Sequence, residues 1–297
     1  MGLRVTDQSR LTNHIAYLQN AADRLDKIQQ QMSTGRRIQR ASDDPEGASI
    51  SLGYRREMLF EAQMRRNAES GTAFMNATES ALSSATDILQ RARELAVQGA
   101  NGTNSQAGRD AMAIEVDQIL QQMVQIGNSS FGGAYIFAGQ KSDQPAFITA
   151  GGANITAVTY QGDTGGRTRR ISKQETVDVN VIGSTTFGDV FQRLIDLRDA
   201  LRSNSTAVVN QSIGYLDTDL NGILAARADI GSRINRFADT SQRSSAKDTD
   251  LQQLKSGIED IDLSETVVKL TAQQNQLQAA LGAIGRTMNM SLLDFLR

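Results

Sequence analysis

The sequence predicts a mainly α protein with a small β insert, built as a long antiparallel, coiled-coil-like helical rod whose terminal helices pair. Apolar residues recur every three or four positions near both ends of the chain, and an unbroken heptad runs through residues 209–237. Only 5% of the 297 residues are aromatic, Trp is absent, and Pro occurs twice. This composition suits long thin helices better than a thick globular core.

The two ends of the chain each carry a narrow apolar stripe. Near the N-terminus the spacing is three, four or seven residues, through Leu11, Ile15, Leu18, Ala22, Leu25 and Met32. Near the C-terminus the stripe comprises Leu270, Leu277, Leu281, Ile284, Met288, Leu292 and Phe295. A single helix cannot bury such a stripe by itself. We therefore expect residues 1–40 and 263–297 to be assembly helices that pair with each other.

Residues 33–51 form a polar loop between two predicted helices, the first of which should end near Gly35. Asp43 or Asp44 can cap the following helix, with Pro45 at its first position. The arginines and aspartates of this loop also leave open an anion or metal site. Capping is favoured, because adjacent Asp residues before Pro need no ligand to explain them.

The first part of the rod should cover residues 41–134. One helix is predicted from Pro45 to about Gln98, with Phe74, Ala81, Ile88 and Leu95 repeating at sevens on its inner face. A Gly- and Asn-rich turn at 99–104 ends it, and a shorter helix follows from about Gln106 to Ile126. Phe74, Ile88 and Leu95 are the predicted rod core of this part.

Residues 135–187 are predicted as an outer β domain, because β-branched residues alternate there. The segment GDTGG, residues 162–166, has the composition of a hairpin turn. Five aromatic residues lie in or near the domain and suggest that it has its own core: Phe131, Tyr135, Phe137, Phe147 and Tyr160. Arg167, Arg169 and Arg170 are interpreted as a solvated strand edge, not a nucleic-acid patch.

The second part of the rod, residues 188–262, contains the clearest heptad. Its seam is Val209, Ile213, Leu216, Leu220, Ile223, Arg227, Ile230, Ile234 and Phe237, of which Ile213, Leu220, Ile230, Ile234 and Phe237 are predicted rod core. Arg227 is either a register-fixing polar residue or a snorkelling one. Asp262 and Glu265 match a capping box, which predicts that one helix stops and another starts there.

The sequence holds no recognisable catalytic or cofactor constellation. There is no Cys, and the single His14 has no second histidine to form a metal site with it. A net charge of −2 argues against a nucleic-acid binder. We expect no enzyme activity, cofactor or metal. No segment is apolar enough to span a membrane, and the start lacks the apolar core of a signal peptide, so any export should use a route without a cleaved signal.

Several blocks in order resemble the flagellin superfamily. STGRRIQRASDDPEGASIS (33–51), LQRARELAVQGANGT (89–103), IGNSSFGGAYIFAG (126–139), ARADIGSRINRF (226–237) and SLLDFL (291–296) are similar to segments of flagellins and flagellar hook-associated proteins. Pro45 and the SLLDFL ending most resemble the hook-associated protein 3 branch, whose members join hook to filament. The modest length of the outer insert points the same way.

The resemblance implies an extracellular structural subunit of the bacterial flagellum, with no cofactor. Its implied partners are further copies in a ring, the other hook-associated junction protein on the hook side, flagellin on the filament side, and a flagellar export chaperone. It implies no nucleic acid and no membrane. Two alternatives stay open from the sequence: a short filament flagellin, and a cytoplasmic coiled-coil scaffold.

Overall fold

The computed structural model describes residues 3–152 and 154–295, with side chains described at 9, 12–152 and 154–285. Seven helices carry most of these residues: α1 (Leu3–Thr34), α2 (Pro45–Ala100), α3 (Gln106–Gly127), α4 (Gly183–Phe187), α5 (Val190–Arg202), α6 (Thr206–Glu259) and α7 (Leu263–Phe295). Six short strands lie between α3 and α4. The predicted mainly α fold with a small β insert is confirmed.

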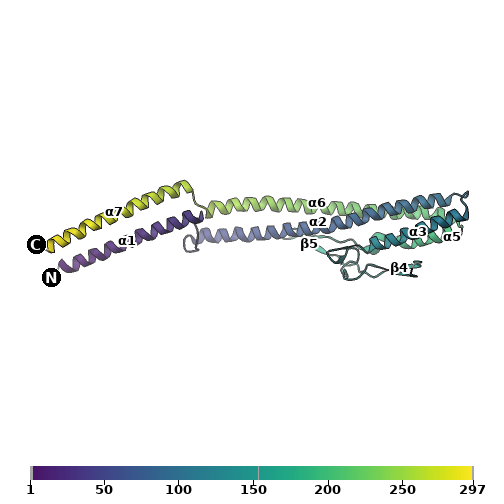
Figure 1. Ribbon diagram of the computed structural model, residues 1–297, viewed down its shortest axis with the longest axis horizontal. Coiled ribbons are helices and arrows are strands. Elements are labelled where there is room, and N and C mark those ends of the chain that lie inside the picture. Colours follow the sequence, from purple (N-terminus) through teal and green to yellow (C-terminus); the bar gives the residue numbers. More distant parts are fainter. Residues whose placement is uncertain (1–2, 153, 296–297) are drawn as a thin grey trace. The chain divides into compact units, whose positions relative to one another are not determined.

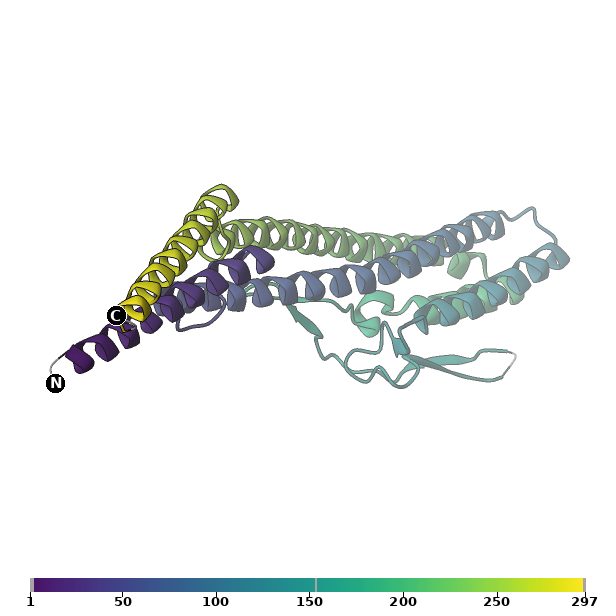
Figure 2. The ribbon, with the colours of Figure 1, turned by 60° about the vertical axis from the view of Figure 1, so that its left-hand side comes forward.

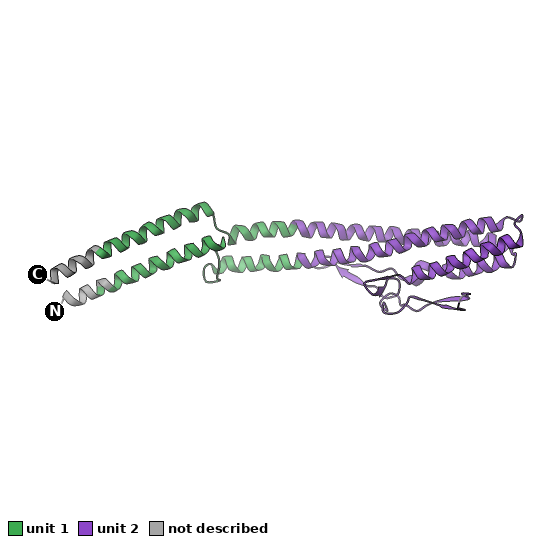
Figure 3. Cartoon of the chain, in the orientation of Figure 1, with its two compact units in different colours: residues 1–60, 247–297 green, residues 61–246 purple. Residues whose placement is uncertain are grey.

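The chain divides into two compact units (Figure 3). Unit 1 comprises residues 1–60 and 247–297, and unit 2 comprises residues 61–246. The long helices α2 and α6 each contribute to both units. The finer division into terminal helices, two rod parts and an outer β domain stays a prediction.

Unit 1 contains the paired terminal helices. Figure 1 shows α1 and α7 side by side, with both ends of the chain at the same end of the pair. Gly35 follows α1 with a φ of +69°, the left-handed conformation expected of a glycine after a helix. Asp262 accepts hydrogen bonds from the backbone N–H groups of Ser264 and Glu265, and so caps α7 as predicted.

Unit 2 is a helical bundle of α3, α5 and the adjoining parts of α2 and α6. The predicted seam residues of α6 face its core: Ile230 and Phe237 are fully buried, whereas Ile213, Leu220 and Ile234 are half-buried. Arg227 leaves the apolar seam and binds Glu79 on α2, 2.8 Å away. It therefore snorkels to a carboxylate at the edge of the seam.

The buried face of α2 is offset by one residue from the predicted one. Phe74 and Leu95 are buried as expected, but Ile88 and Ala81 are only half-buried. The most deeply buried residues also repeat at sevens: Met75, Leu82, Leu89 and Ala96. The reason is that the core around α2 contains residues of α3, α5 and α6, which widens its buried arc beyond a two-helix seam.

The strands form three separate antiparallel hairpins: β1 (Ser130–Phe131) with β2 (Ala134–Tyr135), β3 (Phe147–Ala150) with β4 (Ala157–Tyr160), and β5 (Thr168–Arg170) with β6 (Thr176–Asp178). The predicted hairpin turn at residues 162–166 is wrong. This segment joins two different hairpins, because β4 pairs with β3 and not with β5.

The strands share their core with the helices. Figure 2 shows them gathered beside α3 and α5, and Phe147 packs against Phe187 and Phe191 with ring centroids 5.6 and 4.7 Å apart. The expectation of a separate β core is therefore wrong. Hairpins of two to four residues bury too little surface to be stable alone.

Candidate assembly surface

The terminal helices of unit 1 present apolar side chains to solvent. Ile15 on α1 is 47% exposed and Leu281 on α7 is 53% exposed. The other predicted stripe residues that the structure describes are half-buried: Leu18, Leu25, Leu270, Leu277 and Ile284. The side chains of Leu11, Met288, Leu292 and Phe295 lie outside the described residues. Pairing of α1 with α7 thus covers their stripes only in part.

Further apolar residues of the same helices are exposed, although the sequence patterns did not single them out. Tyr17 on α1 is 72% exposed, and Val267 and Val268 at the start of α7 are also exposed. They lie off the predicted stripes, so periodicity alone does not mark them. Apolar surface spread around a helix is typical of a helix that packs against several neighbours.

The turn before α2 is held by the two aspartates at 43 and 44. Asp44 accepts a hydrogen bond from the N–H of Gly47 at 2.9 Å and caps α2, with Pro45 as its first residue. Asp43 instead accepts from the N–H groups of Gln39 and Arg40 and binds Lys27 on α1 at 2.8 Å. The Lys27 ammonium and these backbone donors lower the pKa of Asp43 to about 2.

The loops on either side of the terminal pair are joined to each other, which the sequence analysis missed. The N–H of Arg37 donates to the oxygen of Glu259 at 2.6 Å, and the N–H of Ile261 donates to the oxygen of Gly35 at 3.1 Å. Arg36 and Asp260 are therefore paired as in an antiparallel sheet. We call this pairing of residues 35–37 with 259–261 the clasp.

Glu259 lies beneath the clasp and is 3% exposed. Its Oε1 accepts hydrogen bonds from Ser51 and, at 2.6 Å, from Arg55 on α2. Burial acts to raise the pKa of Glu259, but the hydrogen bonds from Ser51 and Arg55 outweigh it, so the pKa is lowered and the carboxylate stays ionised.

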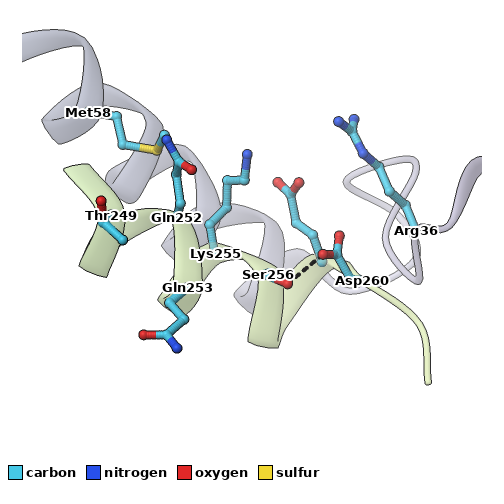
Figure 4. A pocket seen from close by; sticks show the side chains of 9 residues that line it. Arg36, Met58, Thr249, Gln252, Gln253, Lys255, Ser256 and Asp260 are labelled. Carbon is cyan, nitrogen blue, oxygen red and sulfur yellow. Dashed lines mark hydrogen bonds between the residues drawn. The ribbon is translucent and has the colours of Figure 1, made fainter. Parts of the chain in front are cut away.

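An open groove of about 680 Å³ runs beside the clasp (Figure 4). Arg36 and Lys255 contribute cations to its walls and Asp260 a carboxylate, and Ser256 donates a hydrogen bond to Asp260. Mixed charges on an open surface suit a protein contact better than a small-molecule site. Among the described residues, no cluster of three or more His, Asp or Glu residues is arranged to hold a metal. Within the same residues, no helix is long and apolar enough to cross a membrane.

The comparisons with known proteins agree with this geometry. The family model described as the bacterial flagellin N-terminal helical region matches residues 6–142, and that of the flagellin C-terminal helical region matches residues 213–296. A flagellar filament 30.7 kDa core protein of Treponema maltophilum is 30% identical over 272 residues, covering 90% of each chain. The chain belongs to the flagellin family. It is therefore a structural protein of the bacterial flagellum, and the cytoplasmic scaffold alternative is dropped.

Hook-associated proteins are also similar to this flagellin-family chain. The flagellar hook-associated protein 3 of Salmonella typhimurium (strain LT2) is 24% identical over 323 residues, covering 99% of this chain and 100% of the other. A solved structure of a putative flagellar hook-associated protein from Vibrio parahaemolyticus is similar with a TM-score of 0.68 and 22% identity, over 73% of this chain and 100% of the other. The structure of Bacillus cereus FlgL has a TM-score of 0.61 and 23% identity, over 69% and 99%. These structural likenesses show the fold.

Proposed function

We propose that this chain is the structural subunit that joins the flagellar hook to the filament. The observation that carries the proposal is the incompletely covered apolar surface of α1 and α7, with Ile15 and Leu281 about half exposed. Helices with such surface gain stability by packing against further copies, because burial stabilises by about 25 cal/mol per Å² of apolar area. Assembly would therefore complete a core that the single chain leaves open.

The match to hook-associated protein 3 extends over practically the whole of both chains, at 99% and 100%. That likeness, with Pro45 in the loop before α2 and the ending SLLDFL, supports a junction subunit. A filament subunit is the second candidate. It is supported by the higher identity, 30%, to the filament core protein of Treponema maltophilum, over 90% of each chain.

In this proposal the partners are further copies in a ring, the other hook-associated junction protein on the hook side, and flagellin on the filament side. A flagellar export chaperone would cover the exposed stripe of α7 before export, and export would need no cleaved signal. The outer hairpins of unit 2 would face away from the tube. The chain would act without enzymatic activity, cofactor, nucleic acid or membrane.

Immunogold labelling of sheared flagella tests the location. An antibody against residues of unit 2 should label one short zone between hook and filament. Labelling along the whole filament would favour the filament candidate. An antibody against the flagellin of the same cells is the matched control, because it should label the filament and leave the short zone bare.

A further inference from the structure

We infer that the clasp closes in the free monomer and sets the register in which α1 pairs with α7. The inference deepens the proposed assembly role and rests on it. It assigns a positioning role to Arg37, Glu259 and the loops around them, which carry none of the exposed apolar surface.

The clasp is held by side chains as well as by its two backbone hydrogen bonds. The guanidinium of Arg37 donates to the oxygen of Ile258 in the last turn of α6, at 2.9 Å from Nη2. The same group binds Asp44, the N-cap of α2, at 3.1 Å. A cation at a helix C-terminus and a carboxylate at a helix N-terminus are both placed favourably for the helix dipoles. Arg37 thus ties the end of α6 to the start of α2.

Glu259 anchors the other strand of the clasp. While its backbone oxygen accepts from Arg37, its buried carboxylate accepts from Ser51 and Arg55 of α2. Its second oxygen, Oε2, is buried without a hydrogen-bond partner. Releasing the clasp would require moving this anchored residue, so the clasp is tied to the part of unit 1 that α2 and α6 form.

Both terminal helices start directly at the clasp. α1 ends at Thr34, adjacent to Gly35, and α7 begins at Leu263, two residues after Ile261. No long linker is present on either side to absorb a shift. A change of one residue would therefore turn a helix by about 100° relative to its partner.

The apolar stripes agree with the register that the clasp sets. Counting from Arg36 back along α1 and from Asp260 forward along α7, Leu25 and Leu270 lie 11 and 10 residues away. On the same count the paired distances are 18 and 17 for Leu18 and Leu277, 21 and 21 for Ile15 and Leu281, and 25 and 24 for Leu11 and Ile284. Each apolar position of α1 is thus level with one of α7. The hydrogen bond from Gln273 to the oxygen of Ala21 lies in the same register, at 13 and 15 residues.

A double cysteine variant tests whether the clasp closes before assembly. Arg36 and Asp260 flank the two backbone hydrogen bonds as a non-hydrogen-bonded antiparallel pair, whose Cα atoms are typically about 4.5 Å apart. That spacing permits a disulfide. The natural chain has no Cys, so Arg36→Cys with Asp260→Cys can form one intramolecular disulfide. The control is Arg36→Cys with Gln253→Cys, which moves the partner about 10 Å along α6.

In purified full-length monomer, the 36–260 pair should oxidise at least tenfold faster than the 36–253 pair. Adding Arg37→Ala should remove most of that advantage while circular dichroism shows that unit 2 stays folded. Equal rates for the two pairs would overturn the closed clasp. Because this assay uses monomer, its result is independent of whether the chain is a junction subunit.

Insertions test the register. One Ala inserted between Asp262 and Leu263 should abolish incorporation onto hooks, whereas four Ala residues, which turn α7 by only about 40°, should restore it in part. Wild-type protein shows that the incorporation assay itself works. Incorporation of the one-residue insertion at wild-type level would contradict the assigned register.

Discussion

Gln273 on α7 donates a hydrogen bond from Nε2 to the backbone oxygen of Ala21 on α1, 3.4 Å away. This link joins two helices whose remaining interface is a narrow apolar stripe with half-buried leucines on both sides. A pair held in this way depends on further packing for its stability, since isolated helices are marginal in water.

We therefore expect the ends of α1 and α7 to fray in the monomer and to become ordered on assembly. Limited proteolysis of monomer should trim residues beyond the clasp from both ends first and leave a resistant fragment containing unit 2. The same digestion of assembled protein should leave the ends intact. Ends as resistant as the centre in the monomer would contradict this prediction.

A charge placed in the rod should have a different effect from a charge placed on the assembly surface. Ile230 is fully buried in unit 2, so Ile230→Asp should destabilise the fold by about 3–5 kcal/mol. Leu281 is 53% exposed, so Leu281→Asp should leave the unfolding transition of unit 2 unchanged and block incorporation. Urea denaturation and an incorporation assay measure the two effects. If both variants unfold alike, the division between rod and assembly helix is incorrect.

Two glycines within long helices should respond in opposite ways to alanine. A Cβ at Gly71 of α2 would lie 2.8 Å from the ring of the fully buried Phe237, whereas a Cβ at Gly222 of α6 would meet open space. Gly71→Ala should destabilise by about 1–3 kcal/mol through overpacking. Gly222→Ala should stabilise by roughly 0.5–1 kcal/mol, because alanine loses less backbone entropy in a helix.

Thermal denaturation of the two alanine variants compares them directly. A stabilising Gly71→Ala substitution would show that α2 and α6 are packed less closely at this level than the structure indicates.

The Lys27–Asp43 pair predicts a dependence on pH. The pKa of Asp43 is lowered from 3.8 to about 2, so its ionised form stabilises the folded state. The contribution is fully present above pH 4 and is lost as the pH falls towards 2. Asp43→Asn removes it at every pH, so the stability difference between wild type and variant should shrink over this range.

A fluorescent probe can follow that difference locally. The chain has no Trp, so Tyr54→Trp introduced into both proteins reports on the start of α2. A difference that stays constant from pH 5 to pH 2 would show that Asp43 titrates normally.

Local signals in the sequence predicted the helix ends and the main heptad. Pro45, Gly35 and Asp262 act within a few residues of themselves, so their positions suffice to place α2, α1 and α7. The inward positions of α3 were predicted for the same reason, and Ala113, Val116, Leu120 and Met123 are all fully buried.

Long-range pairing was harder to predict. The buried arc of α2 follows from its neighbours, so the sevens through Phe74 and the sevens through Met75 look equivalent in sequence although the second set is more deeply buried. Arg37 meets Ile258 across 221 residues of chain, and nothing near either residue marks the contact. The turn at 162–166 was misjudged because the composition of a turn does not show which strands it joins.

Seeded assembly tests the central claim most directly. Isolated hooks that carry the other hook-associated junction protein are incubated with an excess of labelled full-length protein, and the labelled length is measured by electron microscopy. A junction subunit predicts a short zone whose length does not change with protein concentration and that then accepts flagellin. A labelled filament that grows in proportion to the protein supplied would contradict it.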